Sequence, residues 1–599
     1  MESNEIYELY SKLKNERSEY TSIWNDISEY VGLRYNSNDT MDKNQYVEKN
    51  LDRYINDPTA AISVMNSSEY LLGIVWGLGG DAFKIVPSES LLDNTTVEEV
   101  GNYFNYATEK VLDALNNSES GLHTALKPYF QDQFAFGTSG LGVFKNPKFN
   151  KGQSESPLIV RYYGVDSICI DEGINGMVDY IFTSYSWGVN RIVNEFAVNQ
   201  KTGLIDDKML ATLPRVIVDA YKNNRLTDKF NVVQAIYPRE DYNPKLRGKR
   251  GAKYKGDWFL DGDSDKHIFA SEDYKVLPIA ICRQIKVGRE KYGRSSGTML
   301  IGSIRLVNHA VGEVIQILEK MEDPALLLAN NSLMGDSVLD SSSGSVTVFN
   351  ESLLGNSKQP ITKMYDVGDP TPIIQWLEPY LNNKITTAFK NDMLLDMNSD
   401  ANMTATEASQ RARIRAQALS GMLNQQYNEM VYPIARRTIQ LLLDMDLLGV
   451  RSDSDLAKNM MLMGKSERII PDVIADFIAS GKQWFKIEPN DRVKKMMKTE
   501  KLESLMQFIN VTSMLAQLNP DILMGINLYQ SLKDMAVELG IDASILSGER
   551  EFKELLAQKQ QQQQQLMNMQ ANQMQAQTSK DLATTGKAVS ETNEIKQRS

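Results

Sequence analysis

The sequence predicts an α+β fold in which helices predominate. Three observations support this prediction. Apolar residues recur at helical spacing through the first 136 residues. Short apolar runs bounded by turn residues then follow to about residue 285, as is typical of strands. From Ser295 onward the spacing is helical again as far as residue 557, apart from one polar excursion. The chain is therefore predicted to combine a mixed first part with a largely helical second part.

The first part, residues 1–290, is predicted to place helices before strands. Asp57-Pro58 opens the second helix with proline in its first turn, and Gly137 to Gly140 ends the fourth. We expect these helices over 4–30, 58–77, 96–116 and 121–136. We expect the strands at 141–144, 158–163, 167–170, 177–185, 232–237, 258–260 and 276–282.

An unusually apolar helix is predicted next, within 291–322. Ser295 or Ser296 can cap its first turn, and it is expected to end near Met321, before Pro324. It carries one polar stripe, which comprises Arg305, Asn308, His309, Glu313, Gln316 and Lys320. A helix that is apolar over most of its circumference is packed over most of its circumference.

Residues 323–370 are rich in Gly, Ser, Asn and Asp, with strand-like runs at 325–328 and 345–349. A connection of this length is too long for a simple turn. A second helix is expected over 371–397, ending near Leu395, with Pro379 either in its first turn or at a kink. A short polar loop, 396–403, follows it.

The longest helix is predicted over 404–450. Thr404 and Glu407 have the spacing of a capping box, Pro433 should bend the helix, and Gly449 is expected as its C-cap. Residues 455–557 again have a helical pattern. The tail, 558–599, is rich in Gln and Met, which fits low-complexity disorder and a self-assembling helix equally well.

Composition limits the function. The chain has 599 residues, enough for roughly four structural units. Its 65 basic and 77 acidic residues give a net charge of −12, whereas a protein that coats duplex DNA should be basic. Cys169 and Cys282 form no spaced cluster, so we expect no disulfide scaffold and no cysteine metal site. The acidic start and the short apolar runs predict a cytosolic protein or part of a soluble particle.

The motifs that carry enzyme chemistry are missing or incomplete. Asp261 to Glu272 has acidic residues at EF-hand spacing, but Lys266 occupies the position that needs glycine. We therefore favour an acidic hairpin turn over a calcium site. The chain has no GxxxxGK[ST], GxSxG or HExxH motif. We expect no catalytic residue, no cofactor and no metal, and we interpret the histidines as structural.

Two basic clusters stand out against the acidic background. One is the Gly/Lys/Arg segment 247–255. The other precedes the first apolar helix and comprises Arg283, Lys286, Arg289, Lys291 and Arg294. We expect solvated surface for both, although the second is more suggestive because it lies at the entrance to a long helix.

Four stretches together resemble the head-to-tail connecting (portal) proteins of short-tailed bacteriophages. They are RSEYTSIWNDISEYV at 17–31, the transition from Tyr129 to FGTSGLGV at 136–143, KYGRSS at 291–296 with a helix that ends in EDPALLL at 322–328, and NMTATEASQR at 402–411. Their order and spacing make the resemblance specific over about 17–450. The last 150 residues are similar only in kind.

The resemblance implies a ring of twelve subunits. Residues 1–290 and 404–450 would form a wing, 291–322 and 371–397 paired stem helices, and 323–370 a small clip. The loop 396–403 would face the tunnel and 455–557 would form a helical crown. The tail 558–599 would extend the crown as a helical barrel or be disordered.

The resemblance also implies the function: a viral portal at one capsid vertex of the virion, assembled in the host cytoplasm. Double-stranded DNA would pass through its channel during packaging and ejection. Its partners would be a terminase packaging motor, then tail adaptor proteins, together with the major capsid and scaffolding proteins, and no membrane. The missing P-loop fits this, because a separate motor would hydrolyse ATP.

Candidate contact residues follow from the resemblance. Candidates for the DNA tunnel are Arg305, Lys384, Lys390, Asn398, Ser399 and Asp400. Candidates for partner contacts in the clip are Asn330, Asn331, Asp336, Asp340 and Ser345. For each tunnel candidate, a contact with another subunit or with solvent is an equal alternative.

Two other functions stay open on the sequence. One is a non-viral scaffold or adaptor that oligomerises through its apolar helices, without a channel wide enough for duplex DNA. The other is a calcium-dependent or hydrolytic enzyme, which rests on residues 261–272 and on the size of the mixed part.

Overall fold

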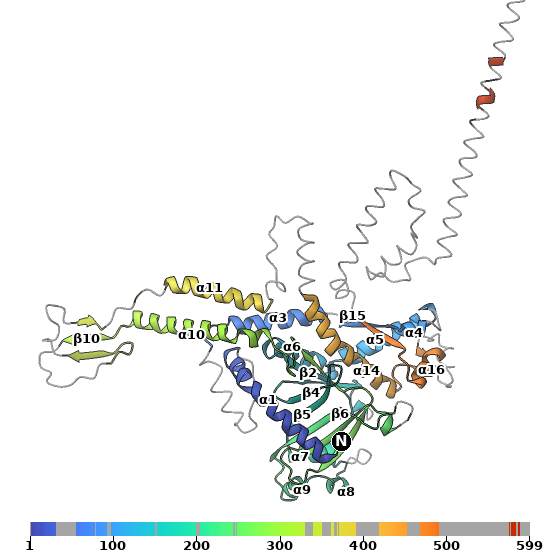
Figure 1. Ribbon diagram of the computed structural model, residues 1–599, viewed down its shortest axis with the longest axis horizontal. Coiled ribbons are helices and arrows are strands. Elements are labelled where there is room, and N and C mark those ends of the chain that lie inside the picture. The colour runs from blue at the N-terminus through green and yellow to red at the C-terminus, as the bar shows by residue number, and fades with distance from the viewer. Residues whose placement is uncertain are drawn as a thin grey trace, which may run out of the picture. The chain divides into compact units, whose positions relative to one another are not determined.

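The computed structural model divides the chain into two compact units, Met1–Val493 and Lys494–Ser599 (Figure 1). In the first unit it describes residues 2–31, 55–77, 80–92, 97–149, 152–198, 204–243, 246, 248–329, 340–349, 361–364, 368, 371–390, 419–451 and 468–489. In the second unit it describes the helical residues 574, 577–580, 582, 585 and 586.

A five-stranded antiparallel sheet forms one part of the first unit. Its order is β4 (Ile168–Glu172), β5 (Val178–Gly188), β6 (Lys229–Pro238), β7 (Tyr254–Leu260) and β8 (Ile268–Tyr274). Helix α1 (Ser3–Val31) packs Tyr7 and Tyr10 against Phe259 on one face. Successive strand residues point to opposite faces, so Val233 belongs to the α1 core and Val232 to the core on the other side.

Short helices cover that other face. They are α7 (Val189–Phe196), α8 (Asp207–Leu210) and α9 (Arg215–Lys222). Trp187 and Trp258 are tilted neighbours 5.7 Å apart, and Phe196 packs on both. The sequence did not predict these three helices, because each spans only one or two turns and offers too little periodicity to recognise.

A second, three-stranded sheet has the order β3 (Leu158–Tyr163), β2 (Thr138–Lys145) and β9 (Ile279–Arg283), with antiparallel neighbours. Helix α6 (Leu122–Ala135) leads directly into β2 and contacts β2, β3 and α3 (Thr59–Val75). Helix α5 (Val97–Asn116), α4 (Glu89–Leu92) and the 3-10 turn Ser118–Ser120 complete this part, and the 3-10 turn Lys249–Gly251 lies in the connection from β6 to β7. Each predicted helix and strand of residues 1–290 is thus confirmed, with ends shifted by a few residues. The prediction that helices precede strands is wrong, because β1 (Phe83–Pro87) lies between α3 and α5, and neither β1 nor β8 was predicted.

Residues 468–489 correct the prediction of a helical region over 455–557. They contain β14 (Ile469–Ile470), paired with β13 (Val450–Arg451), then α16 (Asp472–Ser480) and β15 (Phe485–Pro489). Strand β15 pairs antiparallel with β1 (Phe83–Pro87). Trp484 packs against Phe104 and Tyr103, so this segment belongs to the core built by residues 1–290.

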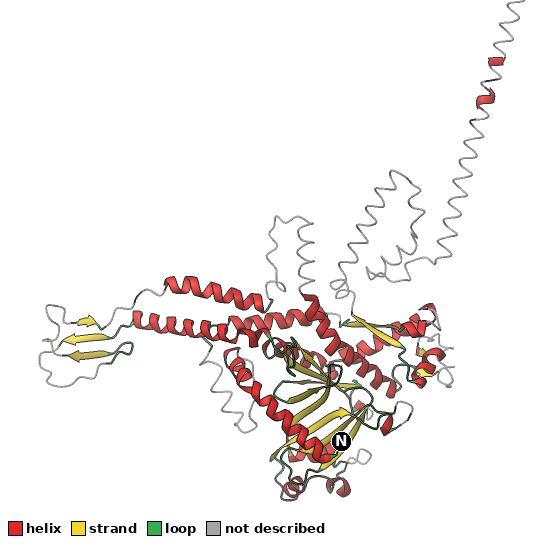
Figure 2. Ribbon diagram, viewed as in Figure 1, coloured by secondary structure: helices red, strands yellow, loops and turns green. Residues whose placement is uncertain are grey.

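The two long helices expected in the centre of the chain are α10 (Ser296–Glu322) and α11 (Thr371–Ala388), which contact each other. Helix α11 ends seven residues before the predicted end at Leu395, because Lys390 takes a left-handed φ of 61°. Pro379 lies inside α11, not in its first turn. A small sheet lies between the two helices along the chain, in the order β11 (Val346–Phe349), β10 (Leu326–Ala329) and β12 (Ile361–Lys363) (Figure 2).

Part of the long helix predicted over 404–450 is described. The chain is helical from 419, passes through a π-helical turn, η5 (Tyr427–Val431), and continues as α14 (Tyr432–Asp444). Pro433 lies at the start of α14, where the wide turn before it tolerates a missing N–H. The prediction of Gly449 as C-cap is wrong: Met445 is the C-cap, and Gly449 lies beyond it with φ 134°.

Candidate functional site: the paired helices and their anchorage

Helix α10 changes its surroundings along its length. It contacts α1, α6 and α11, and the residues that it buries after its first turn, Ile304, Val307 and Asn308, lie in its first half. The side-chain oxygen of Asn308 accepts the backbone N–H groups of Asn56 and Asp57, at 2.5 and 3.2 Å. Beyond Asn308, no residue of α10 is buried. The second half of this apolar helix is therefore left open by the described part of its own chain.

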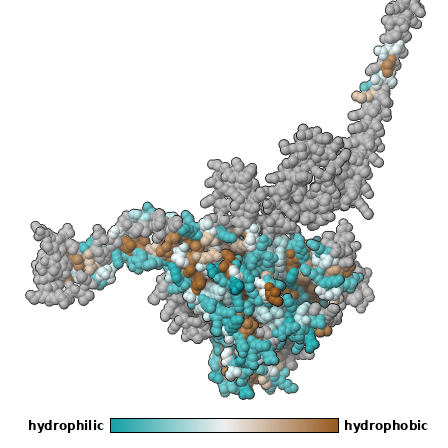
Figure 3. Space-filling model, viewed as in Figure 1, coloured by the Kyte–Doolittle hydropathy of each residue, from teal (hydrophilic) through white to brown (hydrophobic). Residues whose placement is uncertain are grey.

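The open surface of α10 is apolar. Met299, Leu306 and Met321 are half exposed and repeat at intervals that place them on one face, together with Ala310 and Ile317. Ile315 and Leu318 are exposed on other faces. Hydrophobic residues are visible along α10 and α11 in the space-filling view (Figure 3). A contiguous apolar patch of this kind marks an interaction site in a folded protein.

The start of α10 is fixed tightly to α6 and β2. Ser295, one of the two serines predicted as possible caps, caps the helix in a capping box with Thr298. The Ser295 hydroxyl also donates to the carbonyl of Ala135 at 2.5 Å. Gly293 donates its N–H to Thr138 Oγ1 at 2.8 Å. The first turn of α10 therefore has a defined position relative to the three-stranded sheet.

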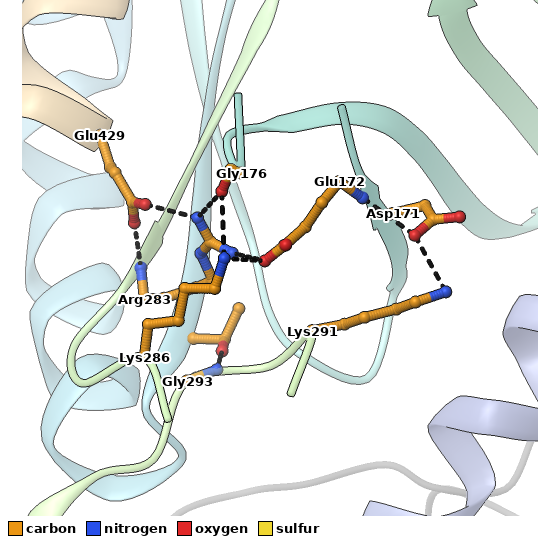
Figure 4. Close-up of polar contacts among 9 residues, drawn as sticks. Asp171, Glu172, Gly176, Arg283, Lys286, Lys291, Gly293 and Glu429 are labelled. Carbon is orange, nitrogen blue, oxygen red and sulfur yellow. Dashed lines mark hydrogen bonds and ion pairs between the residues drawn. The ribbon is translucent and has the colours of Figure 1, made fainter. Parts of the chain in front are cut away.

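A buried ionic cluster lies next to this entrance (Figure 4). Arg283, the last residue of β9, is only 1% exposed. Its Nη2 donates to Glu429 Oε1 at 2.6 Å and to the Gly176 carbonyl at 2.9 Å, and its Nη1 pairs with Glu172. Its backbone N–H also donates to Glu429 Oε2 at 2.8 Å. Arg283 thus joins β9, the π-helical turn η5 and the β4–β5 hairpin at one point.

The partners of Arg283 stabilise its positive charge. Burial alone would disfavour the guanidinium, but Glu429 and Glu172 together hold the pKa of Arg283 above its ordinary value. Buried charges are tolerated when they are paired and hydrogen-bonded in this way. The sequence did not identify Glu429 or Glu172. The only available signal was Arg283 itself, a charged residue that directly follows four apolar strand residues.

We expected the second basic cluster to be solvated surface. This is wrong for Arg283, which is buried, and its neighbours form ion pairs. Lys286 pairs with Glu172 at 2.6 Å. Lys291 pairs with Glu16 at 2.6 Å and Asp171 at 2.9 Å. Arg294 pairs with Glu290. These cations hold the segment before α10 in place, because each is matched by a carboxylate.

The tunnel candidates fall in different surroundings. Arg305 pairs with Asp26 and lies over the Tyr30 ring, so its guanidinium binds α1 of its own chain. Lys384 is exposed on α11. Lys390 is half-buried, and burial lowers its pKa. Asn398, Ser399 and Asp400 lie outside the described residues. The structure does not bring the described candidates together.

Two of the clip candidates share one turn. Ser345 donates its hydroxyl to the Asp340 carbonyl at 2.8 Å, and Ser342 hydrogen bonds lower the pKa of Asp340. Ser343 in the same turn donates to the carbonyls of Glu319 and Asp323, at the end of α10. Asn330, Asn331 and Asp336 lie outside the described residues. The turn at 340–345 therefore closes the last turn of α10.

Residues 261–267 form the turn between β7 and β8, which confirms the acidic hairpin. Asp261 pairs with Lys14 of α1, and Lys266 takes a φ of 47°. The described residues contain no cluster of side chains that could hold a metal ion. None of the helices in this described part has the length and apolarity that a membrane crossing requires. Cys169 and Cys282 are buried free thiols.

Comparison with known proteins shows to which family the chain belongs. The family described as bacteriophage head to tail connecting protein matches residues 3–456. The chain belongs to this family. The probable portal protein of Bordetella phage BPP-1 is 23% identical over 455 residues, which cover 73% of this chain and 74% of that protein. The function is accordingly that of a viral portal, a connector between phage head and tail.

Two further proteins are similar to this head to tail connecting protein. The portal protein of Salmonella phage epsilon15 is 20% identical over 329 residues, and the match spans 54% of each chain, about half the length of that relative. A chain in the virion of a native gene transfer agent particle is 11% identical, and the match covers 70% of this chain and 97% of that chain. Its TM-score of 0.23 is too low to carry an argument about the fold.

Proposed function

We propose that this chain is one of twelve identical subunits of a portal ring at a single capsid vertex. Double-stranded DNA passes through the central channel during packaging and leaves through it during ejection. The observation that supports the ring most directly is α10. Its apolar side chains Met299, Leu306 and Leu318 are about half exposed in the single chain. Neighbouring copies on both sides would cover such a surface.

We propose that the subunit divides into a wing, a stem and a clip. Residues 1–290 and the described part of 404–450 form the wing, with 468–489 added to it through the β1–β15 pair. Helices α10 and α11 form the stem, and the small sheet between them in sequence, within 323–370, forms the clip. We assign 396–403 to a tunnel loop, 455–557 to a crown apart from 468–489, and 558–599 to a tail. Residues 396–403 lie outside the described residues, as do most of 490–599.

The charge of the chain suits a channel that must release DNA. A net charge of −12 per copy disfavours tight contact with phosphates, because binding strength comes from cations that displace counterions. Arg305 is bound to Asp26, so it is a poor tunnel contact. Lys384 of α11 and Lys390, two residues beyond the end of α11, remain candidates. The portal is a conduit with no catalytic step of its own, and a separate terminase motor supplies the work.

The clip provides the surface that successive partners bind. The turn that contains Asp340 and Ser345 is exposed and held against the end of α10, which gives a partner a fixed target. The terminase motor would dock there during packaging, and tail adaptor proteins would replace it later. Major capsid and scaffolding proteins would surround the ring in the assembling virion.

The experiment is to measure the oligomeric state of the full chain by native mass spectrometry. We expect the wild-type protein and Val216→Asp, which changes a half-exposed residue of α9, to form one closed oligomer. Leu306→Asp should prevent assembly, because it places a charge in the interface between stem helices. Assembly of Leu306→Asp equal to that of wild type would count against α10 as the subunit interface.

A further inference from the structure

The turn between β4 and β5 presents an uncovered apolar surface. Ile174, near its tip, is fully exposed, and Met177, three residues later, is exposed as well. Ile285, in the segment that follows β9, is exposed as well. Single exposed apolar residues are normal. Here three of them come from two segments that contact each other, since Lys286 Nζ lies 3.4 Å from the Gly176 carbonyl. We call Ile174, Met177 and Ile285 the turn patch.

The turn patch has a rigid support. Gly173 donates its N–H to the Met177 carbonyl at 2.8 Å, and Gly176 donates to the Gly173 carbonyl at 3.0 Å. The Gly176 carbonyl in turn accepts from the buried Arg283 guanidinium at 2.9 Å. A turn that is held from behind by a buried, paired charge loses little conformational freedom when it binds. Such pre-organisation strengthens association.

The turn patch continues into the surface of the stem. Ile285 forms an antiparallel bridge with Arg294, and Arg294 immediately precedes Ser295, the cap of α10. The uncovered apolar residues of α10 begin at Met299, four residues later. The two apolar surfaces are therefore joined by one short, ion-paired segment, 284–295.

The charges beside the turn patch argue against DNA as the partner that covers it. Of the four cations in 284–294, Lys286, Lys291 and Arg294 are each paired with a carboxylate. Only Arg289 is left to attract a phosphate without breaking an ion pair that the described residues make. A nucleic-acid surface needs several cations that can displace counterions. An apolar occupant fits better.

We propose that the turn patch docks on the adjacent copy of this chain and forms a second, wing-level contact beside the stem interface. This inference rests on the proposed ring. In a ring, each copy uses two different surfaces, one for each neighbour. A projecting turn on one side, pre-positioned by Arg283, is suited to such a contact. The contact would also link the arginine cluster at the stem entrance to the neighbouring subunit.

The test is site-specific photo-crosslinking in assembled rings of the full chain. Ile174→Cys labelled with benzophenone maleimide should give covalent dimers on illumination. Val216→Cys, a half-exposed position on α9, is the matched control and should give none. The native Cys169 and Cys282 are buried, so unsubstituted protein controls for background labelling.

A second variant tests the energetics. Ile174→Asp should need roughly tenfold more protein to assemble, whereas Ile174→Leu should assemble like wild type. Labelled rings with no crosslink between subunits would overturn the inference and leave the ring intact. If the wild-type chain forms no ring at all, the proposed function itself fails, and this inference fails with it.

Discussion

Gly137 and Gly293 approach each other so closely that neither position has room for a side chain. A Cβ atom on Gly137 would lie 2.4 Å from the Gly293 carbonyl oxygen, and a Cβ on Gly293 would lie 2.4 Å from the Gly137 oxygen. Gly137 also has a φ of 84°, which L side chains rarely adopt. This contact joins the end of α6 to the segment that enters α10.

Gly137→Ala should destabilise the first unit by at least about 2 kcal/mol, because it adds a backbone clash to an unfavourable φ. Urea unfolding followed by circular dichroism measures the change. Gly101→Ala in α5 is the matched control, since a Cβ there meets nothing within 4 Å. The control should be neutral or slightly stabilising. Equal effects of the two substitutions would show that the close contact is unimportant.

Breaking the buried pair of Arg283 and Glu429 should be costly. Glu429→Gln leaves part of the guanidinium uncompensated in the interior, and we expect a loss of about 3–5 kcal/mol in the free energy of unfolding. Arg283→Met combined with Glu429→Met should cost less than the sum of the two single changes. Lys127→Met, which breaks an exposed pair with Glu69, should cost no more than about 1 kcal/mol. Additive effects at positions 283 and 429 would contradict a direct pair.

The two thiols should be inert in the folded protein. Burial raises the pKa of both Cys169 and Cys282, which suppresses the reactive thiolate. Ellman's reagent should therefore titrate close to two thiols per chain in urea and almost none under native conditions. Rapid native reaction of either cysteine would contradict the packing around β4 or β9.

Asp132 should make stability depend on pH. Burial raises the pKa of this carboxyl well above its ordinary value, although the Tyr162 hydroxyl donates to it. The folded state therefore binds the proton more tightly than the unfolded state. The resulting stability is complete below the unfolded pKa, about 3.9, and is lost as pH rises through the folded pKa.

Asp132→Asn should remove this dependence. The amide oxygen can still accept from Tyr162, so the variant should be more stable than wild type at pH 8, by about 1–3 kcal/mol, and its stability should vary less between pH 4 and 8. Urea unfolding across that range measures both effects. A variant that is less stable than wild type at pH 8 would show that the buried carboxylate contributes favourably.

Local signals were sufficient for much of the fold. Ser295 or Ser296 was predicted as a cap from its position before an apolar run, and Ser295 caps α10. The strand Leu158–Tyr163 was placed at its observed bounds. Both features depend on side chains that are close in sequence, where spacing and turn residues carry the information.

Strand pairs and ion pairs between residues far apart in the chain could not be predicted from the sequence. Strand β15 is recognised as a strand by pairing with β1, about 400 residues earlier, and its own pattern is too short to distinguish it from helix. Glu429 lies in a helical turn whose sequence gives no indication that Arg283 is its partner. The same holds for Arg305, which looks like a free cation until α1 supplies Asp26.

The central claim is that the chain forms a ring with an open channel, and electron microscopy of the purified full chain tests it most directly. The account predicts closed particles with about twelvefold symmetry, in which α10 of each subunit contacts its neighbours and the channel is wider than a DNA duplex, about 20 Å. A monomer, or a compact oligomer without a channel, that persists across salt and protein concentration would contradict it.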